Sequence, residues 1–114
     1  SSKNFLNDVN KSGKYLLKGL KELKTRHPII GYLDNCGLYT GVELVRDRKT
    51  KEPADVEANY VRDLCVQNGL LFEKGGYYHN RLQLIPPLNI ELKVIDKCIE
   101  ILDFVFEKTR IKFK

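Results

Sequence analysis

Residues 37–54 read GLYTGVELVRDRKTKEPA, and this stretch decides the fold. Successive side chains of a strand point to opposite faces, and the sequence alternates in this way over residues 38–45. The turn residues 34–37 (DNCG) separate this strand from a short apolar run at residues 29–33. An antiparallel hairpin is therefore predicted, followed by an exposed charged loop at residues 46–53. The predicted core face of the second strand carries Leu38, Thr40, Val42 and Leu44.

Three helices are predicted around this hairpin. Residues 3–24 repeat apolar side chains with the helical period, and Pro28 stops this helix because it has no backbone donor. A second helix is predicted to begin with Asp55 as its cap and to end at Asn68-Gly69. Asn89 is predicted to cap a third helix that continues to about Thr109.

Two more short strands complete the pattern. They are predicted at residues 70–72 and 81–85, and Pro86-Pro87 ends the second. The resulting order, αββαββα, places the strands between helices. The sequence therefore predicts an α+β fold, with one domain over residues 1–114 and a small, mainly antiparallel sheet covered by helices.

The composition is that of an ordinary globular protein. Hydrophobic residues make up 42% and charged residues 31% of the 114. No apolar run approaches the ~20 residues that cross a bilayer, and the first residues lack a secretory signal. The odd count of 3 cysteines without CxxC spacing favours a reducing compartment. We expect a cytoplasmic protein that binds no membrane, with the mitochondrial matrix as the alternative.

The net charge of +5 raises the question of nucleic-acid binding. Lysines recur at helical spacing in the first helix, and such a stripe can attract phosphate backbones. The opposite face of the same helix is apolar, and no aromatic residue lies among the lysines. The stripe is therefore interpreted as the solvated face of an amphipathic helix, and no nucleic-acid partner is expected. It comprises Lys11, Lys14, Lys18 and Lys21.

The sequence offers no self-contained active site. His27 and His79 are the two histidines, and neither has a cysteine or carboxylate at metal-ligand spacing. Cys65 and Cys98 fall on apolar helix faces and are interpreted as small buried hydrophobes. The pair Gly75-Gly76 favours a turn over a phosphate-binding loop. No catalytic residue and no metal site are predicted.

One strand does point to a binding function. In residues 81–85 the alternation directs Leu82 and Leu84 to the core, so Arg81 and Gln83 share the other face, ~6.6 Å apart along the strand. A guanidinium on a rigid strand is suited to binding a carboxylate in a bidentate fork. The alternative interpretation is an exposed basic residue on a sheet face.

Four segments together resemble the C-terminal small domain of class III aminotransferases, which are fold type I enzymes. They follow one another with nearly gapless spacing over almost the whole chain. The segments are YLLKGLKELKTRHPIIG (15–31), GLYTGVELVRDRKTKEPA (37–54), VRDLCVQNGLL (61–71) and NRLQLIPPLNI (80–90).

The resemblance implies a function for a larger parent protein. In this family a large domain, which would lie outside this chain, binds pyridoxal 5'-phosphate through a Schiff-base lysine. The small domain closes over the active site and supplies an arginine for the substrate carboxylate, and the enzymes are homodimers. The resemblance thus implies transfer of an amino group from an amino acid or amine to a 2-oxo acid, with no activity in the isolated chain.

The chain departs from the family pattern at the carboxylate site. Counted back from Pro86-Pro87, the expected arginine falls at Gln83, while Arg81 lies two residues earlier on the same face. The family's arginine-glycine pair before the hairpin strand is replaced by Asp34 and Asn35. Loss of a charged partner would weaken carboxylate binding by on the order of 1–3 kcal/mol. Arg81 and Gln83 are the predicted substrate-binding residues, and a non-catalytic dimerisation or interaction domain is the alternative.

Overall fold

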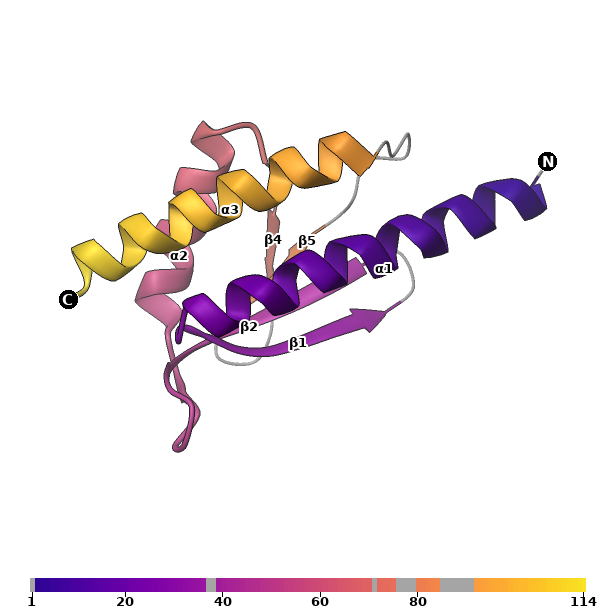
Figure 1. Cartoon of the computed structure of the whole chain (residues 1–114). Coiled ribbons are helices and arrows are strands. Elements are labelled where there is room, and N and C mark those ends of the chain that lie inside the picture. Colours follow the sequence, from indigo (N-terminus) through magenta and orange to yellow (C-terminus); the bar gives the residue numbers. More distant parts are fainter. Residues whose placement is uncertain (1, 37–38, 71, 76–79, 85–91) are drawn as a thin grey trace.

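The computed structural model describes residues 2–36, 39–70, 72–75, 80–84 and 92–114. It confirms an α+β architecture (Figure 1). The elements in chain order are α1 (Ser2–Arg26), β1 (Ile30–Cys36), β2 (Tyr39–Asp47), β3 (Glu52–Pro53), α2 (Asp55–Gln67), β4 (Phe72–Gly75), β5 (Arg81–Leu84) and α3 (Leu92–Lys112).

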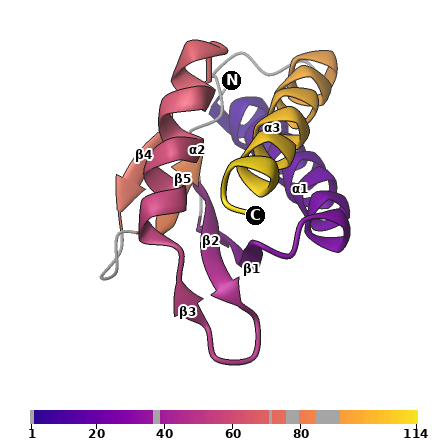
Figure 2. The same cartoon turned by 90° about the vertical axis from the view of Figure 1, so that its left-hand side faces the viewer.

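The strands form one antiparallel sheet with the order β1-β2-β5-β4, and β3 pairs with the end of β2. Helices α1 and α2 pack against one face of this sheet, α3 packs on these two helices, and the β2–β3 ribbon extends beyond them (Figure 2). Helices α1 and α3 lie side by side and run in the same direction (Figure 1). The opposite face of the sheet is therefore left free of the three helices.

The core lies between the sheet and the helices, as the alternation in the sequence predicts. Thr40, Val42 and Leu44 of β2 are buried, as are Leu82 and Leu84 of β5. Each apolar side chain buried there stabilises the fold by about 1.5–3 kcal/mol. The helices contribute residues one turn apart: Leu16, Leu20 and Leu23 from α1, Val61 and Cys65 from α2, and Ile95, Leu102, Val105 and Phe106 from α3.

The start of α2 differs from the prediction. Ala54 precedes the helix and Asp55 is its first residue, without a side-chain cap. The Oδ1 atom of Asp55 accepts a hydrogen bond from the backbone N–H of Val56 at 2.9 Å and another from Nη2 of Arg46 at 3.0 Å. Val56 is 55% exposed, whereas Glu57 is buried, so the polar side chain points inward at this turn. The predicted stop at Asn68 is confirmed, because Asn68 is the C-cap and the following glycine has a φ of +86°.

The strands also differ in length from the predictions. β1 continues through Cys36, so Asp34 and Asn35 belong to the strand and not to the turn. β2 continues to Asp47, and β3 pairs with it, so the predicted exposed loop is partly a two-stranded ribbon. β4 begins at Phe72 instead of residue 70. The predicted cap Asn89 and the pair Pro86-Pro87 lie outside the described residues.

Candidate functional site

The free face of the sheet carries polar side chains from three adjacent strands. Directly opposite residues of an antiparallel pair point to the same side. The register aligns Asp34 of β1, Gly41 of β2 and Gln83 of β5 in one row. The neighbouring row contains Tyr32, Glu43 and Arg81. Tyr32 is 54% exposed, whereas Arg81 and Gln83 are half-buried.

Arg81 uses its guanidinium to cross two strands. Its Nη2 lies 2.5 Å from Oδ1 of Asp34 and donates a hydrogen bond to it. The exposed fractions of the two side chains are 24% and 33%, so solvent screens this ion pair less than one on an open surface. The ion pair joins β5 to β1 across the intervening strand β2.

Gly41 makes this crossing possible. It lies on β2 between the two partners, and a Cβ there would overlap both the guanidinium of Arg81 and the carboxylate of Asp34. Only a residue without a side chain leaves the backbone of β2 open to such a close approach. Gly41, within the stretch 37–54 that decides the fold, is thus required by the ion pair that lies over it.

The arrangement can bind a polar group but offers little chemistry beyond binding. Gln83 lies directly opposite Gly41, so the register places its amide in the row that the Arg81 guanidinium crosses. An amide supplies both donor and acceptor groups, and a guanidinium supplies only donors. Both predicted binding residues therefore share one face of β5.

His27 has a structural position in the helical layer. The ring is buried, and its Nε2 lies 2.7 Å from Oδ1 of Asp103. It also contacts the ring of Phe106 at a centroid distance of 5.6 Å. Asp103 accepts a second hydrogen bond from Arg26 at 3.2 Å. The side chain thus helps join α1 to α3, whereas His79 lies outside the described residues.

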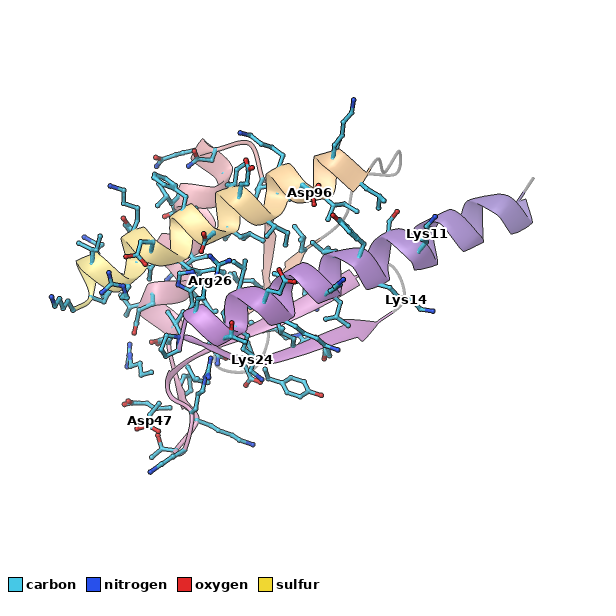
Figure 3. All side chains as sticks on the ribbon, in the orientation of Figure 1. Lys11, Lys14, Lys24, Arg26, Asp47 and Asp96 are labelled. Atoms are coloured by element: carbon cyan, nitrogen blue, oxygen red, sulfur yellow. The ribbon has the colours of Figure 1, made fainter. Side chains whose placement is uncertain are left out.

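The remaining candidates also lie away from the free face of the sheet. Burial raises the pKa of the Cys65 thiol to about 12, and it also raises the pKa of Cys98. The lysine stripe is exposed to solvent, and Figure 3 shows its members Lys11 and Lys14 along α1. Within the described ranges, no cluster of three histidine, cysteine or carboxylate side chains could hold a metal ion. No helix there is long and apolar enough to cross a membrane.

The sequence did not predict the cluster around Arg46. Its guanidinium donates to both carboxylate oxygens of Glu57, from Nε at 2.9 Å and from Nη2 at 3.0 Å. These hydrogen bonds lower the pKa of Glu57 below its usual range. Both residues line a cavity of about 680 Å³ that also contacts Phe106 and Phe113. A glutamate at an inward-facing helical position was the signal that could have revealed this cluster.

Known proteins resemble this chain over nearly its full length. The family model for class III aminotransferases matches residues 1–106. The chain is 41% identical over 96 residues to a mitochondrial alanine–glyoxylate aminotransferase 2 homolog of Arabidopsis thaliana, covering 84% of this chain and 20% of that protein. It is 38% identical over 115 residues to taurine–pyruvate aminotransferase of Bilophila wadsworthia, covering 96% and 25%.

The fold is shared as well. A crystal structure of an aminotransferase from Bacillus anthracis superposes with a TM-score of 0.85 and 35% identity, covering 94% of this chain and 25% of that one. The chain thus spans between 20% and 25% of the length of these three relatives. With the family model matching all but the last few residues, the chain belongs to the class III aminotransferase family.

Proposed function

We propose that this chain is the C-terminal small domain of a longer enzyme that transfers an amino group from an amino acid or amine to a 2-oxo acid. The family assignment supports this proposal, because the two relatives from Arabidopsis thaliana and Bilophila wadsworthia are aminotransferases. The lengths support it too, since the chain corresponds to 20–25% of each relative. The remainder of such a parent would supply a large domain that packs beside this one.

The main support for a substrate-binding role of this domain is the set of polar side chains on the free face of the sheet. β5 holds Arg81 and Gln83 there, both half-buried. Gln83 lies in the row of Asp34 and Gly41, and Arg81 lies in the next row and reaches Asp34 from it. A charged donor beside an amide is suited to orienting a carboxylate or another polar end group. We infer that this face borders the substrate and that Arg81 and Gln83 contact it.

Class III aminotransferases depend on pyridoxal 5'-phosphate, whose phosphate requires cationic or backbone N–H donors. The free face of the sheet, as far as it is described, does not fit that group by itself. The guanidinium of Arg81 is paired with Asp34, and Glu43 lies opposite it in the sheet. We therefore assign the cofactor to the rest of the parent. The small domain would bind and orient the substrate, and it would leave the proton transfers to residues elsewhere.

Amino transfer by the full-length parent tests the proposal. Purified parent, supplied with pyridoxal phosphate, is expected to convert pyruvate or glyoxylate to the amino acid when an amine donor is present. Arg81→Ala is expected to raise the KM for carboxylate substrates about tenfold, which corresponds to ~1.4 kcal/mol, because it removes the guanidinium and leaves the Asp34 carboxylate unpaired on the same face. An unchanged KM would show that Arg81 does not contact substrate. The 114-residue chain alone is expected to be inactive.

A second function is favoured by a specific observation. Gln83 replaces the expected arginine, and Arg81 is paired within the chain, so the face could belong to a non-catalytic aminotransferase-like domain that mediates dimerisation or protein interaction. The two functions differ in measurable ways. A parent that forms a homodimer but neither binds pyridoxal phosphate nor transfers amino groups would support the second. We place the parent in the cytoplasm, with the mitochondrial matrix as the alternative.

A further inference from the structure

The Asp34–Arg81 ion pair puts a carboxylate of the protein where a substrate carboxylate would have to bind. Nη2 of Arg81 lies 2.5 Å from Oδ1 of Asp34, and both side chains are largely shielded from solvent. We infer that Asp34 is a specificity-determining residue of this face. It occupies Arg81 internally, so the face accepts an uncharged or cationic substrate end group and discriminates against an additional carboxylate. This inference rests on the proposed function.

The geometry restricts how Arg81 could respond to a ligand. Its guanidinium lies over Gly41, in a position that a Cβ would occupy, and it points toward β1. A ligand that approaches the row of Asp34, Gly41 and Gln83 therefore meets the guanidinium and its carboxylate partner together. A new carboxylate must either displace Asp34 or lie beside it, where the two like charges repel each other.

Among the described residues, the other charged groups of this face do not restore a free cation. Glu43 lies directly opposite Arg81 and adds a second carboxylate to the neighbourhood. Glu43 also borders a hollow of about 300 Å³ that is lined by Arg48 and Lys51. The Arg48 guanidinium donates to the carbonyl oxygens of residues 24 and 27, so it is directed toward the end of α1. Around Gly41, one guanidinium thus has two carboxylates in its neighbourhood, and Asp34 is the one to which it donates.

Asp34 competes with a substrate carboxylate for the Arg81 guanidinium, and it has an advantage because it belongs to the same folded chain. A partner held within the same fold acts at a high effective concentration, so a free carboxylate must outcompete it before it gains the guanidinium. Gln83 is not subject to this competition, because its amide is neutral and offers both donors and an acceptor. An end group that hydrogen-bonds to Gln83 without needing Arg81 is therefore preferred.

The test uses the full-length, cofactor-loaded protein with glutarate as an inert dicarboxylate probe and glutaramide as its neutral analogue. Isothermal titration measures both dissociation constants in wild type, Asp34→Asn, Arg81→Gln and the double variant. We expect Asp34→Asn to tighten glutarate binding about tenfold and to leave glutaramide binding within twofold. The gain should vanish in the Arg81→Gln background, because the guanidinium that Asp34 releases is then missing.

Two further variants keep the result interpretable. Gly41→Ala inserts a methyl group between the partners and should separate them with both charges retained, so it should also tighten glutarate binding. Asp96→Asn removes the same charge from the helical layer, where Asp96 accepts a hydrogen bond from Tyr15, and should change neither constant (Figure 3). Unchanged glutarate binding in Asp34→Asn, or an equal gain without Arg81, would overturn the inference.

The titration separates this inference from the proposed function. If Asp34→Asn binds glutarate more tightly but no parent preparation transfers amino groups, the inferred role of Asp34 stands and the proposed enzyme function is rejected. If the parent transfers amino groups but glutarate binding is unchanged, the enzyme function stands and the role of Asp34 is rejected. In an active parent, Asp34→Asn is also expected to lower the KM for a dicarboxylate oxo acid such as 2-oxoglutarate more than the KM for pyruvate.

Discussion

Arg46 of β2 holds the carboxylate of Glu57 in α2 at both oxygens, with N–O distances of 2.9 and 3.0 Å. The pair fastens the first turn of α2 to the sheet, where Ala54 provides no side-chain cap. The Glu57 side chain is 10% exposed and that of Arg46 is 39% exposed. A buried carboxylate held in this way contributes to stability only while it is ionised.

The first prediction concerns this pair. Glu57→Gln is expected to lower the free energy of unfolding at pH 7 by about 1 kcal/mol, since one partner is partly exposed to solvent. Urea denaturation of the chain measures the change. Glu100→Gln is the matched control, because Glu100 is 73% exposed and 3.6 Å from Lys97. Equal stabilities of the two variants would contradict the structural role of Glu57.

The pH dependence of the same variant follows from the lowered pKa of Glu57. A carboxyl group whose pKa is lower in the folded state stabilises the fold fully above its unfolded pKa, which is near 4.5. That contribution is lost as the pH falls through the folded pKa. The stability gap between wild type and Glu57→Gln should therefore be constant at neutral pH and should shrink below about pH 4.5. If the stability difference instead grew as the pH fell, the pKa of Glu57 would be raised by folding, and its ion pair with Arg46 would be refuted.

A second prediction addresses the core beneath the free face. Leu82 is fully buried in β5 between two polar neighbours, so Leu82→Ala should destabilise the chain by about 2–5 kcal/mol through lost burial and a residual cavity. Val66→Ala is the control, because Val66 is 49% exposed in α2. Both are measured by urea denaturation monitored by circular dichroism. Similar effects of the two substitutions would show that β5 does not face the core as described.

The third prediction concerns thiol reactivity. Cys65 is fully buried and its pKa is raised to about 12, so almost no thiolate is present at pH 8. Cys65 is expected to resist iodoacetamide in the folded chain and to react completely in guanidinium chloride, as measured by peptide mass spectrometry. Cys98 is half-buried and should react at an intermediate rate. Rapid alkylation of Cys65 in the folded state would contradict its burial.

The fourth prediction isolates a backbone effect at the end of α2. Gly69 has a φ of +86°, and a Cβ there would meet nothing within 4 Å. Gly69→Ala should therefore cost about 1–2 kcal/mol through the left-handed backbone conformation alone. Gly69→Asn is expected to cost less, because asparagine tolerates that conformation. Thermal unfolding of the two variants measures the difference, and equal melting temperatures would remove this explanation.

Local periodicity predicted the inward faces of β2 and β5, although Val45, on the other face of β2, is buried as well. The alternation in residues 38–45 and 81–85 places Val42 and Leu82 inward because a strand repeats every two residues regardless of its neighbours. The register between strands is not a local property. Asp34 and Arg81 are 47 residues apart, and their contact depends on the strand order and on a glycine between them. The sequence therefore predicted the face of Arg81 but not its partner.

The error at α2 has a similar physical cause. Asp55 has the residue type of a helix cap, yet it is the first residue of the helix, where its Oδ1 atom accepts hydrogen bonds from both the backbone N–H of Val56 and the guanidinium of Arg46. Capping preference is worth about 1 kcal/mol, which a charge-assisted hydrogen bond from another element can outweigh. Patterns that depend on one helix or one strand were predictable, whereas side-chain pairs between elements were not.

The last prediction restores the charge that the family pattern expects. In the full-length parent, Gln83→Arg is expected to lower the KM for carboxylate substrates about tenfold, because it adds a second guanidinium to a face where Asp34 is already engaged with Arg81. The register places it near Arg81 across from Gly41, so Asp34 becomes the carboxylate that keeps the two cations compatible. Asp34→Asn should accordingly lower the melting temperature more in the Gln83→Arg background than in wild type. A lower KM without this larger loss of melting temperature would mean that the guanidinium groups at positions 81 and 83 do not lie together over Gly41.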